Sequence, residues 1–122
     1  MPQVLVRNTS QYSTHTIQAE LCNNFFSRLM GLMFRKELKP NSGIIIDEIK
    51  DSRIDSSIHM LFMRFDIAVI WINSAMQVVD TRIARKWQLW LAPSAPARYV
   101  LETHPVLLHN FEVGNLVEFI YD

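Results

Sequence analysis

Two residues of the sequence, His59 and Glu102, form a candidate acid–base pair. His59 is the polar exception inside the longest apolar region of the chain, residues 57–73, and Glu102 follows the apolar Val100 and Leu101. A histidine and a glutamate within hydrogen-bond reach can exchange protons with a substrate, as in a small hydrolase or isomerase. The alternative is a structural histidine whose ring nitrogens are bonded to the backbone.

Three arginines suggest a second kind of site. Arg28, Arg35 and Arg64 lie around a predicted helix and a predicted bend of the chain. The planar guanidinium group binds a carboxylate or a phosphate through two parallel hydrogen bonds. The three side chains therefore either surround an anionic ligand or form structural ion pairs, for which the acidic candidates are Glu102, Asp66 and Asp47.

Basic and aromatic residues are interleaved between Arg82 and Trp90. This composition is typical of a surface on which the bases of single-stranded nucleic acid stack. The whole chain, however, has 12 basic and 12 acidic residues and no net charge, so no global field attracts nucleic acid or anionic lipid. Nucleic acid is therefore a disfavoured partner. We expect Trp87 and Trp90 to pack, or to stand at the rim of a ligand groove.

Metal and cofactor chemistry has little support in the sequence. The four histidines form no HExxH motif, and His104 and His109 would need a third ligand from elsewhere. Cys22 is the only cysteine, so one chain forms neither an internal disulfide nor a thiolate metal cluster. The three glycines fall in no phosphate-binding or dinucleotide-binding motif. We expect no metal and no cofactor.

The hydrophobic pattern predicts about eight short strands. Alternating or β-branched segments place them near 3–7, 15–21, 44–46, 57–63, 66–73, 77–83, 98–103 and 116–121. The unbroken apolar run from Ile67 to Ile72 is typical of a strand that is buried on both faces. We expect residues 47–56 to be mostly loop, and residues 91–97, with two prolines, to be irregular.

One short helix is expected near residues 24–31. Apolar residues recur there at helical spacing, an asparagine can cap the first turn, and Gly31 ends the regular part. Many strands with one helix predict a mainly β single domain over residues 1–122. Its expected architecture is a mostly antiparallel two-sheet sandwich or a partly open barrel.

The order of several fragments resembles the domain of unknown function 192 family of bacteria and archaea. These fragments are 28–35, Gly43, 59–63, Ile67, Pro93, 99–102 and Gly114. The resemblance implies a compact, mainly β, sandwich-like fold with a short helix. It implies no activity, because the biochemistry of the family is not established. Three positions depart from the family pattern: Ala68, Val106 and Asn115. If these positions form a site in the family, this chain lacks part of that site.

The sequence has enough apolar residues for a large core but no recognisable set of catalytic residues. This combination favours a small non-enzymatic binding or interaction module. The groove is expected near the helix, and its candidate ligand-binding residues are Arg28, Arg35, His59, Arg64, Trp90 and Glu102. The partner is an unidentified small ligand or a protein. The many aromatic residues and methionines would also suit an exposed patch that joins copies into a homo-oligomer.

No segment has the pattern of a secretory leader, and no apolar run reaches the length of a membrane span. The sequence therefore predicts no membrane partner and a cytoplasmic location. A leader upstream of this chain would leave the same pattern.

Overall fold

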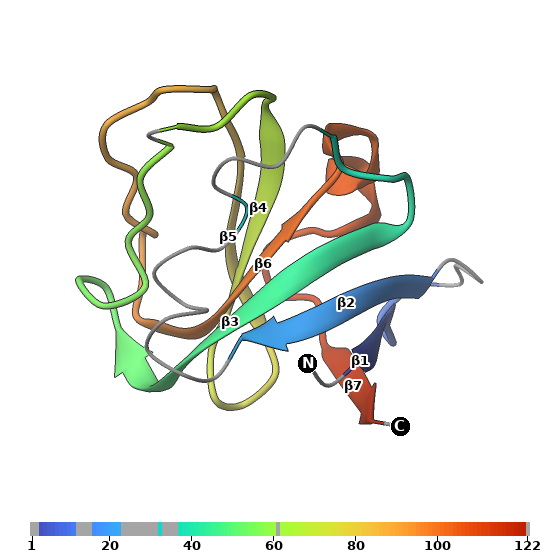
Figure 1. Cartoon of the computed structure of the whole chain (residues 1–122). Coiled ribbons are helices and arrows are strands. Elements are labelled where there is room, and N and C mark those ends of the chain that lie inside the picture. Colours follow the sequence, from blue (N-terminus) through green and yellow to red (C-terminus); the bar gives the residue numbers. More distant parts are fainter. Residues whose placement is uncertain (1–2, 12–15, 23–31, 33–36, 61, 122) are drawn as a thin grey trace.

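The computed structural model describes residues 3–11, 16–22, 32, 37–60 and 62–121. The elements in these ranges are β1 (Gln3–Asn8), β2 (Thr16–Cys22), β3 (Ser42–Ser52), β4 (Ile67–Ile72), β5 (Val78–Ala84), β6 (Ala97–Thr103), the 3₁₀ helix η1 (Pro105–Asn110) and β7 (Val117–Tyr121) (Figure 1). The predicted mainly β fold is confirmed. The helix expected near residues 24–31 lies outside the described ranges. No helix within them is long and apolar enough to cross a membrane.

The seven strands form one sheet in the order β5-β4-β6-β3-β2-β1-β7. Neighbouring strands are antiparallel except for β2 and β3, which run parallel with Gln18 opposite Ser42. Parallel neighbours need a crossover connection, which explains why a long segment separates Cys22 from Ser42. The sheet is therefore mostly antiparallel, as the strand pattern predicts.

The two edge strands meet at one end of the sheet. Gln77, just before β5, forms an isolated antiparallel bridge with Leu116, just before β7. The backbone N–H of Val78 donates to the carbonyl of Asn115 at 2.9 Å, and that of Gly114 donates to the carbonyl of Val78 at 2.8 Å. The described strands thus form a single, partly open barrel rather than two separate sheets.

Each face of the sheet carries an apolar cluster. All seven strands contribute to an interior cluster that includes Val6, Ile70 and Leu101. An outer cluster lies on the opposite face of β3, β4 and β6, and its buried members include Ile44, Ile67, Val69, Trp71 and Val100. All six residues of β4 are buried, because both of its faces are covered. This confirms the interpretation of the run from Ile67 to Ile72.

The strand predicted at residues 57–63 is wrong. Among the described residues of this segment, only Ile58 forms a β-bridge, and its partner is Leu91. The chain then turns, with the N–H of Met63 donating to the carbonyl of Met60 at 3.2 Å and Phe62 at a φ of 62°. Ile58, Met60 and Met63 are buried from a loop that lies over the outer cluster, so the apolar character of these residues reflects burial and not pairing in a sheet.

The loop predicted for residues 47–56 is wrong in its first part, because β3 continues to Ser52. The pairing of β3 with β6 shifts register between Asp47 and Ser52. The carboxylate of Asp47 accepts from the N–H of Ile49 at 2.7 Å and from Arg98 at 2.9 and 3.1 Å. A bulge stabilised by a paired acid allows this polar segment to remain in the sheet.

Candidate functional site

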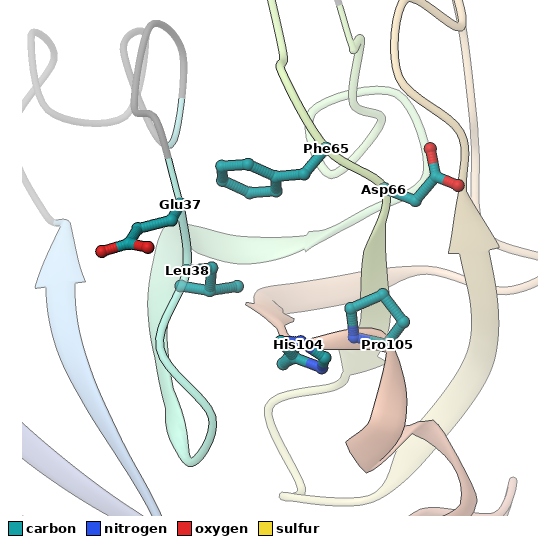
Figure 2. A pocket seen from close by; sticks show the side chains of 6 residues that line it. All are labelled: Glu37, Leu38, Phe65, Asp66, His104 and Pro105. Atoms are coloured by element: carbon teal, nitrogen blue, oxygen red, sulfur yellow. The ribbon is translucent and has the colours of Figure 1, made fainter.

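A pocket of about 360 Å³ lies where β3 begins, β6 ends and β4 begins. Figure 2 shows that Leu38 and Phe65 extend toward each other from two separate segments, with His104 and Pro105 beside them. Leu38 and Phe65 also pack on the outer cluster. The carboxylates of the two other lining residues, Glu37 and Asp66, point away from this apolar centre (Figure 2).

Glu102 lies on the face of the sheet that carries the outer cluster, on which the pocket residues Leu38 and Phe65 pack. It is paired with Ile44 of β3 and Val69 of β4, which both belong to the outer cluster. Directly opposed residues of antiparallel strands share a face, so the side chain of Glu102 leaves β6 on the side that Leu38 and Phe65 cover. Glu102 is only 6% exposed. None of the side-chain hydrogen bonds or ion pairs within the described ranges involves it.

Burial raises the pKa of Glu102 to about 7, because the loss of water disfavours the charged carboxylate. A carboxyl group with this pKa gains and loses its proton near neutral pH. When protonated it donates a hydrogen bond, and when ionised it needs a cation or several donors. Glu102 is therefore a buried group that can exchange a proton, on the face of the sheet where Leu38 and Phe65 pack.

His104 gives the pocket a second polar group. Its Nδ1 accepts from the backbone N–H of Val106 at 3.2 Å, which caps the start of η1. In a neutral imidazole the proton then lies on Nε2, which acts as a donor. From the sequence, the one functional role considered for His104 was that of a metal ligand together with His109. No group of three His, Cys, Asp or Glu side chains within the described part of the chain could hold a metal ion.

Asp66 is fixed by the neighbouring loop. The backbone N–H of Lys86 donates to its carboxylate at 2.8 Å, and Arg85 donates at 3.3 Å. The Lys86 bond is the largest influence on the pKa of Asp66; with the bond and charge of Arg85 it outweighs burial and holds that pKa below its usual range. Asp66 thus stays ionised at neutral pH and joins the start of β4 to the segment after β5.

The structure distributes the predicted site residues over different places. Arg28 and Arg35 lie outside the described ranges. His59 is exposed whereas Glu102 is buried, and their pairing stays a prediction.

The other two predicted ligand-binding residues are at the surface. Trp90 is 60% exposed. Arg64 is exposed and lines a second hollow of about 420 Å³ together with Phe62, Met63, Lys86 and Trp87. Two of the acids proposed as partners of the arginine cluster have other partners: Asp47 pairs with Arg98, and Asp66 pairs with Arg85.

Sequence reasoning missed Leu38, Phe65 and the pocket role of His104. These residues come from three distant segments, and no spacing rule connects them. The one available signal was local: a histidine directly before a proline is a good start for a short helix, since proline is favoured in the first turn. That signal indicates η1 but not the pocket beside it.

Comparisons with known proteins place the chain in a family. A family model described as "Uncharacterized ACR" matches residues 6–119. The chain belongs to the domain of unknown function 192 family. The UPF0127 protein of Pyrococcus furiosus is 36% identical over 105 residues, which cover 84% of this chain and 87% of that protein. A UPF0127 protein of Thermococcus kodakarensis is also 36% identical; the match covers 84% of this chain but 64% of that longer protein.

Solved structures share the fold of this family member. A Sinorhizobium meliloti protein described as a "putative transcription regulator" superposes with a TM-score of 0.81 at 20% identity, covering 97% of this chain and 92% of that one. A protein of unknown function from Novosphingobium aromaticivorans gives a TM-score of 0.77 at 22% identity, covering 95% and 83%. At these identities the likeness concerns the fold alone.

Proposed function

We propose that this domain binds a small organic amine in the pocket between Leu38, Phe65 and His104. The observation that carries the proposal is the burial of Glu102, two residues before His104 and on the face of the sheet where Leu38 and Phe65 pack, without a described protein partner for its carboxyl group. A buried carboxyl group that lacks a partner destabilises the fold when it is ionised. A ligand that supplies the partner recovers that free energy on binding.

An ammonium group matches the charges around the pocket. The described lining residues include neither lysine nor arginine, while the carboxylates of Glu37 and Asp66 point away from the apolar centre and Asp66 is paired with Arg85. A cation near Glu102 would stabilise the ionised carboxyl and lower its pKa. The side chains of Leu38, Phe65 and Pro105 provide apolar contacts for the rest of the ligand, and Nε2 of His104 provides a donor for a hydroxyl or carbonyl oxygen. The ligand class is therefore a small amine with an apolar body.

Amide NMR titrations with benzylamine and with benzyl alcohol, its uncharged analogue, test the proposal. We expect saturable shifts around Leu38, Phe65 and His104, with benzylamine bound more tightly than benzyl alcohol. Affinity for the amine should rise as the pH increases through about 7, where Glu102 ionises.

Two variants separate a specific role of Glu102 from a general charge effect. Glu102→Gln should remove the preference for the amine, whereas Glu112→Gln, which removes an exposed charge, should keep it. Shifts scattered over the surface would contradict the proposed pocket. Equal affinity of the parent for both probes, or a Glu102→Gln protein that keeps the preference for benzylamine, would contradict the role of the carboxyl group.

A second candidate function is a hydrolase or isomerase in which Glu102 transfers protons. The specific observation in its favour is the pKa of about 7, which suits a general acid–base catalyst at neutral pH. Proton NMR of simple esters, amides and isomerisable ketones incubated with the protein tests this alternative. Turnover that is lost in Glu102→Gln would support it, and unchanged substrates would leave binding as the better description.

A further inference from the structure

Two loops lie side by side next to β4 and present aromatic rings to solvent. Ile58 and Leu91 exchange two backbone hydrogen bonds of 2.8 and 2.9 Å. Met60 donates to the carbonyl of Gln88 at 2.7 Å and accepts from the N–H of Trp87 at 2.9 Å. The side chains of Ile58, Met60 and Leu91 are buried in the outer cluster and anchor the described parts of the two loops to the sheet.

The rings of Phe62 and Trp87 form the centre of this surface. Their centroids are 5.3 Å apart in an edge-to-face arrangement, and the two residues are 44% and 55% exposed. Both have positive φ angles, 62° and 65°, a conformation that bulky side chains rarely adopt. Strained residues that hold large rings in solvent rather than in the core are typical of binding sites.

Positive charge surrounds the two rings. Arg64 and Lys86 line the 420 Å³ hollow with Phe62, Met63 and Trp87. Within the described ranges no ion pair uses either of these two cations, whereas the neighbouring Arg85 is paired with Asp66. The surface therefore has exposed rings together with two cations available to an anion. The positive charges of Arg64 and Lys86 favour an anionic ligand, and the exposed rings favour a ligand with a flat group that can stack on them.

We propose that the surface formed by Phe62, Arg64, Lys86 and Trp87 binds single-stranded nucleic acid. An unpaired base can stack on the exposed rings, and the adjoining phosphates can lie against Arg64 and Lys86. A duplex hides its bases, so it offers these rings nothing to stack on. The sequence had indicated such a surface through residues 82–90 alone. The structure adds Phe62 and Arg64 from the facing loop, which the sequence separates from Trp87 by more than twenty residues.

Fluorescence anisotropy with a labelled oligothymidylate of about eight nucleotides, a common site size, tests the proposal. Phe62→Ala and Trp87→Ala should each weaken binding roughly ten-fold, the effect of losing one stacked base. Phe62→Leu and Trp87→Leu, which keep apolar bulk but lack a ring, should behave alike. Arg64→Gln and Lys86→Gln should weaken binding and each reduce the slope of log affinity against log salt by about one.

Matched controls come from distant exposed residues. Tyr121→Ala removes an exposed ring on β7, and Lys50→Gln removes an exposed charge on β3; neither should change affinity. Three outcomes would overturn the proposal. They are no binding at about 50 mM salt, where phosphate contacts are strong, ring variants that bind as tightly as the parent, or tighter binding of an acidic phenylalanine-containing peptide. The last would assign the surface to a protein partner.

Discussion

Gly43 of β3 lies directly against the backbone of Glu102 on β6. A Cβ atom on Gly43 would lie 2.4 Å from the carbonyl oxygen of Glu102 and 3.2 Å from Cβ of Thr103. The hydroxyl of Thr103 donates to the carbonyl of Ser42 at 2.6 Å, which holds the two strands together at this point. The close approach therefore requires glycine at residue 43, and it fixes the strand segment that carries the buried carboxyl group.

Gly43→Ala should destabilise the protein by about 1–3 kcal/mol, because a methyl group meets backbone that cannot move without disturbing the ladder. Urea denaturation measures the loss. It should be accompanied by a changed affinity for benzylamine, since Glu102 must shift. Gly114→Ala is the comparison: it meets no atom within 4 Å but has a φ of 96°, so it should lower stability without changing the pocket.

Glu102 should make the protein less stable as the pH rises. Its folded pKa, about 7, is raised above the ordinary 4.5 by burial. The contribution of Glu102 to stability should therefore be largest below about pH 4.5, fall by about 3 kcal/mol up to about pH 7, and stay constant above it. In Glu102→Gln this decline should be absent, so the variant is more stable than the parent at pH 8. Denaturation at a series of pH values measures it, and a Glu112→Gln protein that lost the same decline would contradict this assignment.

Asp80 should be needed for stability at neutral pH. Burial favours its neutral form, but hydrogen bonds from Arg82 and Ser94 outweigh burial and lower its pKa. Its Oδ2 accepts from Arg82 at 2.8 Å and from the N–H and hydroxyl of Ser94 at 2.9 and 2.8 Å. Asp80→Asn should cost about 2–4 kcal/mol at pH 7, since Arg82 loses its partner.

The loss of stability caused by Asp80→Asn should be smaller at acidic pH. A carboxylate with a lowered pKa stabilises the fold above its unfolded pKa of about 3.8, and this contribution disappears as the pH falls through the folded value. Thermal melts at pH 7 and at about pH 2.5 measure both effects. A difference between parent and variant that is equally large at both values would show that the lost charge is not the cause.

The three tryptophans should differ in access to solvent. Trp71 is fully buried, its Nε1 donates to the carbonyl of Ser56 at 2.8 Å, and the guanidinium of Arg82 lies 5.4 Å from its ring centre. Trp87 and Trp90 are exposed. Iodide should therefore quench most of the fluorescence of the parent but almost none in a Trp87→Phe, Trp90→Phe protein. Strong quenching in that variant would show that the core around Trp71 is open.

The sequence by itself determined which segments become strands where buried residues recur at regular positions along the chain. The alternation around Val4 and Val6 and the continuous run of β4 led to strands at the predicted places, because side chains in a strand alternate between two faces. The same reasoning failed at residues 57–63. Hydrophobicity records that a residue is buried, and Met60 and Met63 are buried from a loop.

The tertiary structure alone decided which segments become neighbours. The sequence singled out Glu102, yet its burial depends on Ile44 and Val69, which come from β3 and β4. The pocket combines residues near 38, 65 and 104, and the aromatic surface joins Phe62 to Trp87. Periodicity is a local property of the chain, whereas these contacts follow from strand order and from the parallel crossover between β2 and β3. No local pattern specifies them, because each depends on packing between segments far apart in the chain.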